Sequence, residues 1–289
     1  MFHCTEHGGA MKRTKTKRGL EKRDAVAKTL DLLCWLVDDL AENGGRAWGV
    51  RELAEQLGFS PATVHRSLAG LMRHGFVQQG GSAGKYSIGM EVYRLALKVQ
   101  PHLSLRNAAM PVMQELVAKC NEAAFLGFYD ASRLQMMFVA VINSSHPLRY
   151  VVPINEWIPV HAGASGLAVM AFLPESERRA IVERRGLPRI TEATFTDPDR
   201  LEAELVKVRR RGYAFSRGQR TKGAVAIAAP IWGPNGRVLG ELNLSLPEPR
   251  FDESMTPAYA KLVIKHAQRI TENLGGKPPS EYKPKPVST

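Results

Sequence analysis

Residues 53–77 read LAEQLGFSPATVHRSLAGLMRHGFV and contain two helical segments joined by a short turn. The first segment ends at Gly58, because glycine tolerates the positive φ that such a turn requires. The second begins at Ser60-Pro61, since serine caps free amide groups and proline at the first helical position loses no hydrogen bond. Ala54 is small enough to let the two helices cross closely. The stretch predicts a helix-turn-helix, although an ordinary helical hairpin would also explain Ala54 and Gly58.

The flanking sequence extends this pair into a larger unit. Upstream, apolar residues at spacings of 3 or 4 predict a helix over 24–43, and VRELAEQL predicts the first helix of the pair over 50–57. Downstream, FVQQ and KYSIG flank a glycine-rich tip within 76–89, which is typical of a β-hairpin. Helix, helix, turn, helix and hairpin, in this order, predict a winged helix-turn-helix over 24–89.

A winged helix-turn-helix inserts its second paired helix into the major groove of DNA. Arg66 is the strongest candidate for base contacts, because a guanidinium can bridge O6 and N7 of guanine. His65 lies at the edge of the buried face, where packing and a DNA contact are equally expected. Arg73 and the wing residue Lys85 are better placed for phosphates. The predicted DNA-binding residues are Ser60, Ala62, Thr63, His65, Arg66, Arg73 and Lys85.

The chain of 289 residues has a formal net charge of +12, which favours a polyanionic partner such as nucleic acid or an anionic membrane surface. No apolar run reaches the roughly 20 residues of a bilayer span, and the N-terminus lacks the apolar core of a signal peptide. We therefore expect a cytoplasmic protein that does not bind membranes. Residues 1–23 should form a flexible basic arm, for which a DNA contact and a solubilising role are equally compatible with the composition.

Little in the sequence indicates catalysis or a metal. His3, Cys4 and His7 form a weak cluster near the N-terminus that does not predict a metal site. His161 precedes Ser165 by four residues, which could place both on one side of a helix, but neither a G-x-S-x-G elbow nor an acidic partner accompanies them. We predict no catalytic residue, cofactor or metal. A small-molecule hydrolase or other enzyme with an accessory DNA-binding domain is the alternative function.

Beyond a linker helix at 90–102, the sequence predicts a second, larger domain over 103–275 that mixes helices and strands. A Pro- and Lys-rich tail at 276–289 should be disordered. The expected helices lie at about 105–120, 163–173, 174–185, 199–211 and 253–273, and the expected strands at 123–130, 134–142, 148–154, 224–232 and 237–246. Small residues at 162–165 should open a concave wall for a ligand and expose amide protons at a helix N-terminus, where an anion binds favourably.

Four blocks of the sequence resemble the IclR family of bacterial transcription regulators. The blocks are the 53–77 stretch with its wing, PVHAGASGLAVMAFL, RRRGYAFSRG and GAVAIAAPIWGPNGRVLGELNLSLP, and the resemblance covers about 24–273. It implies an α+β protein with an N-terminal winged helix-turn-helix and a C-terminal, GAF-like effector-binding domain built on an antiparallel sheet. Members are homodimers or homotetramers that bind operator double-stranded DNA and respond to small organic acids, with RNA polymerase as a further partner. Within the family, the sequence is most similar to regulators of aromatic-acid catabolism.

The resemblance also implies an effector pocket. In such relatives it is formed by the small-residue helix start, a polar position after the GYAF-like segment, and inward side chains of the last two strands. The positions that correspond are Ala164, Ser165, Ser216, Ala226, Asn243 and Ser245. Ser216 and Ala226 replace an aspartate and a cysteine of other members, so we expect a ligand bulkier than a very small keto acid. Arg149 is a further candidate as a carboxylate partner, although a solvated surface arginine is the simpler interpretation.

Ligand binding would then change the spacing of two recognition helices through the linker helices. A purely architectural nucleic-acid binder is a second alternative, which the size of the second domain disfavours. The sequence predicts an effector-responsive transcription regulator.

Overall fold

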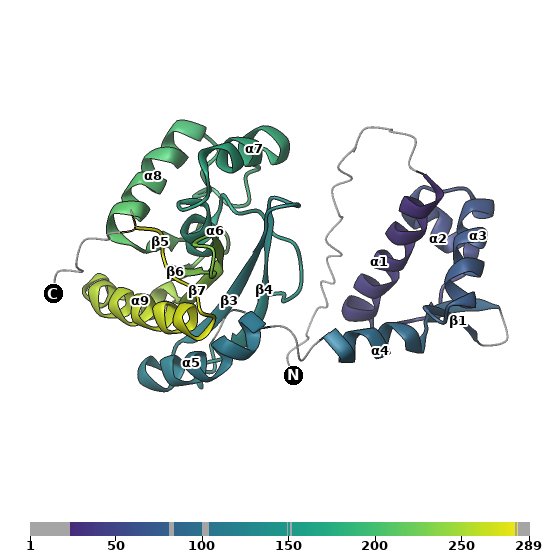
Figure 1. Ribbon diagram of the computed structural model, residues 1–289, viewed down its shortest axis with the longest axis horizontal. Coiled ribbons are helices and arrows are strands. Elements are labelled where there is room, and N and C mark those ends of the chain that lie inside the picture. Colours follow the sequence, from purple (N-terminus) through teal and green to yellow (C-terminus); the bar gives the residue numbers. More distant parts are fainter. Residues whose placement is uncertain are drawn as a thin grey trace, which may run out of the picture. The chain divides into compact units, whose positions relative to one another are not determined.

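The computed structural model describes residues 24–80, 84–99, 104–148, 150, 152–280 and 282. The chain divides into two compact units between residues 100 and 101, and each unit is described by itself (Figure 1). The basic arm and Arg149 lie outside the described residues. Within the described ranges, no helix is both long and apolar enough to cross a membrane.

The first unit is a winged helix-turn-helix, as predicted. Its elements are α1 (Ala25–Asn43), α2 (Val50–Leu57), α3 (Pro61–Arg73), β1 (Val77–Gly80), β2 (Lys85–Ile88) and α4 (Met90–Val99). The hairpin of β1 and β2 is antiparallel, and backbone hydrogen bonds of 2.7 and 2.8 Å join Trp48 to Tyr86 beside it. Because this wing is present, an ordinary helical hairpin does not describe the unit.

Local signals in the sequence explain where these helices begin and end. Asp24 Oδ1 accepts a hydrogen bond of 2.7 Å from the Ala27 amide, and Ser60 Oγ accepts one of 3.3 Å from the Thr63 amide. Gly58 ends α2 with a φ of 68°. A buried core that includes Leu53, Val64 and Leu68 then holds the helices together. Met72, near the end of α3, is 41% exposed because it lies at the edge of the buried face.

The second unit is built on one antiparallel sheet with helices on both faces (Figure 1). The strand order is β4-β3-β7-β6-β5. The strands are β3 (Ala123–Asp130), β4 (Gln135–Ile142), β5 (Ala214–Arg217), β6 (Ala224–Trp232) and β7 (Val238–Pro247). The helices are α5 (Ser104–Cys120), α6 (Gly163–Met170), α7 (Glu175–Arg185), α8 (Pro198–Arg211) and α9 (Thr256–Asn273), with short 3₁₀ turns η2 (Glu248–Arg250) and η3 (Glu253–Met255). The predicted α+β class is confirmed.

The alternation of side chains along β7 separates two environments. Leu242 and Leu244 point into an apolar core with α5 and α9. The intervening positions face α6 and include the polar residues Glu241 and Asn243, both buried. The face toward α6 therefore holds buried polar groups that need hydrogen-bond partners.

Three parts of the second unit differ from the expectations. The described residues of 148–154 form no strand. Pro153 lacks the amide proton that hydrogen bonding between strands requires. Further along the chain, Ile158 forms an isolated antiparallel β-bridge with Met136. Strand β5 was not predicted, because four residues are too few to show a period. Tyr282 lies in the tail predicted to be disordered, but its ring centroid is 5.3 Å from those of Phe172 and Trp232. The aromatic ring gains apolar contacts there, which the overall composition of the tail does not reveal.

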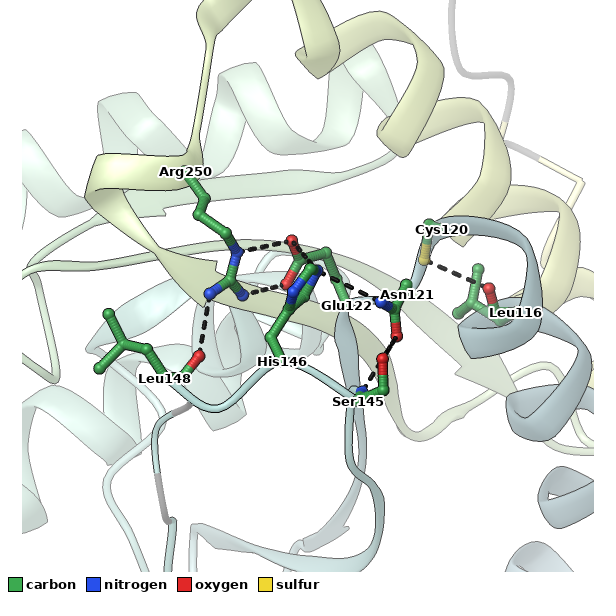
Figure 2. A network of polar contacts seen from close by, with 8 residues as sticks. All are labelled: Leu116, Cys120, Asn121, Glu122, Ser145, His146, Leu148 and Arg250. Atoms are coloured by element: carbon green, nitrogen blue, oxygen red, sulfur yellow. Dashed lines mark hydrogen bonds and ion pairs between the residues drawn. The ribbon is translucent and has the colours of Figure 1, made fainter.

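A polar network fixes the loop after β4 (Figure 2). Arg250, from η2, donates to both carboxylate oxygens of the buried Glu122 at 3.1 and 2.6 Å, and to the Leu148 carbonyl at 2.9 Å. Asn121 Oδ1 accepts from the amide and the hydroxyl of Ser145, both at 3.0 Å. The network anchors the start of the segment that leads to Val152, a residue that lines the cavity described below.

We expect Gly166→Ala to destabilise the second unit. A Cβ at Gly166 would lie 2.3 Å from the Val160 carbonyl oxygen, so α6 would have to move, at a cost of about 1 to 3 kcal/mol. Gly70→Ala is the matched control, because a Cβ there meets nothing within 4 Å and alanine is the better helix former by about 1 kcal/mol. Urea unfolding followed by circular dichroism measures both, and an unchanged midpoint for Gly166→Ala would contradict the proposed close approach.

Candidate functional site

The predicted DNA-binding residues of α3 lie along its exposed side. Ser60, Ala62, His65, Arg66 and Arg73 are exposed, and Thr63 is half-buried. His65 is therefore a surface residue and not part of the core. The side chains of Thr63 and Ser60 are joined by a hydrogen bond of 2.9 Å, which fixes the first turn. The neighbouring Ser67, in contrast, is buried and lies 2.8 Å from Thr29 Oγ1.

The wing residue Lys85 has a partner in α2. Its ammonium lies 3.8 Å from Glu52 Oε2, and that oxygen also accepts a hydrogen bond of 2.7 Å from the Gly49 amide. The backbone hydrogen bond lowers the pKa of Glu52, so the carboxylate stays charged. An exposed ion pair of this kind contributes little stability, so a phosphate could take the place of Glu52.

A cavity of about 50 Å³ lies between α6 and the sheet of the second unit. It contains six of the seven predicted effector residues, and Arg149 lies outside the described residues. The lining residues are Phe125, Phe138, Val152, Gly163, Ala164, Ser165, Ser216, Gln219, Arg220, Thr221, Ala224, Ala226, Asn243 and Ser245. Sequence reasoning missed the segment 219–221; a polar run directly after the GYAF-like block is the signal that could have identified it.

The amide groups at the start of α6 already have partners. The Gly163 amide donates to Gln219 Oε1 at 3.2 Å, and the Ala164 amide donates to Ser216 Oγ at 2.8 Å. Gly163 has a φ of 79°, a conformation that suits glycine. A ligand oxygen could replace either side chain as the acceptor.

The cavity is smaller than we expect from Ser216 and Ala226, which replace an aspartate and a cysteine of other family members. Ser216 Oγ is bonded to the Ala164 amide, which keeps it against α6. A cavity of about 150 Å³ is known to hold benzene, three times the volume present here. The expectation of a bulkier ligand therefore does not follow from this shape of the cavity, and an aromatic ligand requires it to open.

Arg220 brings a positive charge to the cavity wall. Its Nη2 donates to the carbonyl oxygens of Pro159 and Ala162 at 2.9 and 2.6 Å. Burial lowers the pKa of this guanidinium to about 10, so it remains charged near neutral pH. A Cβ at Gly163 would lie 3.3 Å from the Arg220 side chain, so glycine suits the packing as well as the backbone angle.

Two buried polar side chains, Glu241 and Asn243, lie on the face of β7 toward α6. Asn243 Nδ2 donates to Ser165 Oγ at 2.7 Å. Glu241 is fully buried, and this burial raises its pKa to about 8 despite hydrogen bonds from Asn243, Ser165 and the Gly127 amide. A Cβ at Gly127 would lie 2.4 Å from Glu241 Oε1, so the absence of a side chain there makes room for the carboxyl group. Glu241 was not predicted, because an acidic residue within a strand carries no sign of its environment.

His161 and Ser165, the candidate pair for hydrolysis, have different hydrogen-bond partners. His161 Nε2 lies 2.9 Å from the Pro188 carbonyl, which can only accept, so Nε2 carries a proton. Burial lowers the pKa of His161. The Ser165 hydroxyl interacts with Asn243 instead. Among the described residues, no group of three His, Cys, Asp or Glu side chains could hold a metal ion; the Cys4 cluster lies outside them.

The fold and the cavity define a DNA-binding protein with a separate ligand-binding unit, and comparison with known proteins identifies the family. The IclR helix-turn-helix domain matches residues 25–81, and the bacterial transcriptional regulator IclR C-terminal domain matches residues 97–272. The chain belongs to the IclR family: it is a transcription regulator with a helix-turn-helix DNA-binding domain and a C-terminal effector domain.

Individual relatives agree with this assignment. The transcriptional repressor IclR of Escherichia coli K12 is 28% identical over 252 residues, which cover 87% of this chain and 90% of the relative. A crystal structure of a putative IclR regulator from Silicibacter sp. TM1040 has a TM-score of 0.75 at 28% identity, and covers 90% of this chain and 100% of that one. An IclR homologue from Microbacterium hydrocarbonoxydans, crystallised with 4-hydroxybenzoate, has the same fold with a TM-score of 0.70 at 24% identity, and covers 85% and 98% of the two chains.

Glu241 should make stability depend on pH. Its pKa is about 8 in the folded protein, against an ordinary 4.5. Between these values the folded protein holds a proton that the unfolded chain releases, so the free energy of unfolding falls as pH rises through this range. Each pKa unit corresponds to about 1.4 kcal/mol. The free energy of unfolding of wild type should therefore fall by roughly a few kcal/mol over this pH range, and Glu241→Gln should not show this decrease.

Urea unfolding near pH 5 and near pH 9 measures this difference. The control is Glu175→Gln, because the Glu175 side chain is 73% exposed and its replacement should leave the pH dependence of wild type. Equal pH dependence in wild type and Glu241→Gln would show that folding does not raise the pKa of Glu241.

Proposed function

We propose that the protein binds operator double-stranded DNA as a homodimer or homotetramer, and that a small organic acid in the cavity controls this binding. The observation that carries the proposal is the cavity itself. Positions carried over from the family's effector pocket meet there with the α6 amide groups and the charged guanidinium of Arg220. Amide groups at a helix N-terminus and a guanidinium are both suited to a carboxylate.

Aromatic acids are included in the proposal, on condition that the cavity opens. The Microbacterium homologue was crystallised with 4-hydroxybenzoate, which supports this class. Val152 belongs to the part of the wall that carries no regular secondary structure, so this is where opening would disturb the fewest backbone hydrogen bonds. Arg149, close to Val152 in the sequence, remains a candidate carboxylate partner.

Self-association is supported by exposed apolar side chains of the first unit. Met90 and Leu97 of α4 are 71% and 67% exposed, and Val26 of α1 is 66% exposed. Exposed apolar side chains on these two helices are compatible with contacts to another copy of the chain. We also infer that the regulator acts in the cytoplasm, where bacterial DNA lies, with RNA polymerase as a further partner and without catalysis.

The DNA contact is tested by Arg66→Ala. We expect a loss of about 1 to 3 kcal/mol in operator affinity and a relaxed base preference at one position, because the guanidinium would no longer bridge a guanine. Fluorescence anisotropy with operator fragments measures both. Arg184→Ala, which removes an exposed arginine of α7, is the control and should bind like wild type. Wild-type affinity and base preference in Arg66→Ala would show that α3 does not read bases through Arg66.

The effector contact is tested by Ser165→Phe. Ser165 is 5% exposed and lines the cavity, so a phenyl group there should fill it. A thermal-shift screen with aliphatic and aromatic carboxylates should stabilise wild type by an amount that grows with affinity, and the variant should lose this shift while it still binds operator DNA. A carboxylate that stabilises the variant as much as wild type would place the effector elsewhere.

A further inference from the structure

A second pocket lies at the other end of α6 from the cavity. Its volume is about 500 Å³, against about 50 Å³ for the cavity, and small-molecule sites occupy roughly 300 to 1,000 Å³. The wall of the cavity includes Gly163, where α6 begins, whereas Phe172 and Leu173, which follow the end of α6, line the second pocket. The cavity and the second pocket share no lining residue, so they are separate sites.

Aromatic and aliphatic side chains form much of the wall of the second pocket. They come from β3, the segment after α6, β6 and β7, and they include Phe128, Phe172, Leu173, Trp232, Val238 and Leu239. Phe128, Phe172 and Leu239 are only half-buried, so part of their apolar surface is in contact with water. A ligand that covers this surface gains the free energy of removing it from water.

The C-terminal tail contributes a further part of the wall, at Pro279. Three residues later, the ring centroid of Tyr282 lies 5.3 Å from those of Phe172 and Trp232. The Tyr282 hydroxyl also donates a hydrogen bond of 3.3 Å to the Gly212 carbonyl. These contacts hold the tail against the second unit, and they hold this part of the wall in place.

The charged side chains in the wall already have partners. Glu177 accepts a hydrogen bond of 3.1 Å from the Tyr129 hydroxyl and forms an ion pair with Arg237. Arg178 Nε lies 3.3 Å from Glu202 Oε2. The side chains of Glu177 and Arg178 are only 17% and 18% exposed, so breaking either pair would leave a charge with little access to water.

The other charged residue in this wall, Glu175, pairs with Arg179 at 2.6 Å. Among the described residues that line the second pocket, each charge therefore has an opposite charge beside it. An ionic ligand would lose its own hydration and would have to displace one of these pairs to find a partner. An uncharged ligand incurs neither cost.

We propose that the second pocket binds an uncharged aromatic small molecule, at a site separate from the cavity. The aromatic rings of the wall provide edge and face contacts for a ligand ring, and the paired charges disfavour ions. This inference goes beyond the proposed function, because it concerns a different site and a ligand without an acidic group.

Isothermal titration calorimetry on the full chain near neutral pH tests the inference. Indole and benzyl alcohol are the uncharged probes, and benzoate and benzylammonium carry the ring of benzyl alcohol with a negative or a positive charge. We expect saturable binding of at least one uncharged probe to the second pocket. Neither charged probe should bind there as tightly as benzyl alcohol.

Ala131→Trp is designed to block the second pocket. Ala131 lines it and is exposed in the turn between β3 and β4, so an indole side chain can occupy space there without entering the core. We expect the affinity for the uncharged probe to fall at least about tenfold. Ala258→Trp is the matched control, because Ala258 is exposed on α9 and lines neither site, and it should bind the probe like wild type.

Ser165→Phe, which fills the cavity, shows which of the two sites a probe occupies. Saturable binding that persists in Ser165→Phe and falls in Ala131→Trp supports the inference. If Ser165→Phe fails to fold, the comparison of Ala131→Trp with Ala258→Trp still decides.

Three results would overturn the inference. The first is that neither indole nor benzyl alcohol binds in a saturable way. The second is that Ala131→Trp keeps wild-type affinity for both, because the probes then bind elsewhere. The third is that benzoate or benzylammonium binds as tightly as benzyl alcohol and loses this affinity in Ala131→Trp, because the second pocket would then accept ions.

Discussion

Helix α6 lies so close to the segment before it that a Cβ at Gly166 would be 2.3 Å from the Val160 carbonyl oxygen. This approach lets the start of the helix reach the polar groups of β5 and of the segment that follows β5. Ser216 and Gln219 satisfy the amides of Ala164 and Gly163 there. A bulkier residue at 166 would move the whole helix start, and the cavity depends on that contact because α6 forms one of its walls.

The face of β7 toward α6 shows how a buried polar surface is maintained next to an apolar core. Asn243, Ser165 and Glu241 share their hydrogen bonds, and Gly127 leaves the space that the Glu241 carboxyl group occupies. Two buried oxygens of this network, Glu241 Oε2 and Asn243 Oδ1, have no hydrogen-bond partner. Hydrogen-bonded polar groups in the protein interior are expensive to disturb, so the rest of the network holds these side chains in place.

Local signals predicted much of the fold. The cap at Ser60 and the glycine at 58 set element boundaries within one or two residues, because each acts through neighbours in the chain. The predictions failed where distant contacts decide. Residues 148–154 have strand-like composition, but those of them that the structure describes form no strand, and β5 is recognisable only from its pairing with β6.

By itself, the sequence determined the winged helix-turn-helix, most helices and strands of the second unit, and the candidates at 164, 165, 216, 226, 243 and 245, since period, capping and resemblance are properties of the chain alone. Only the tertiary structure decided that Gln219 and Arg220 join them, that the cavity is small, and that one amide oxygen has no partner. Burial and hydrogen bonding between residues far apart in the sequence are set by packing, and packing determines both the pKa of Glu241 and the free acceptor on Asn243.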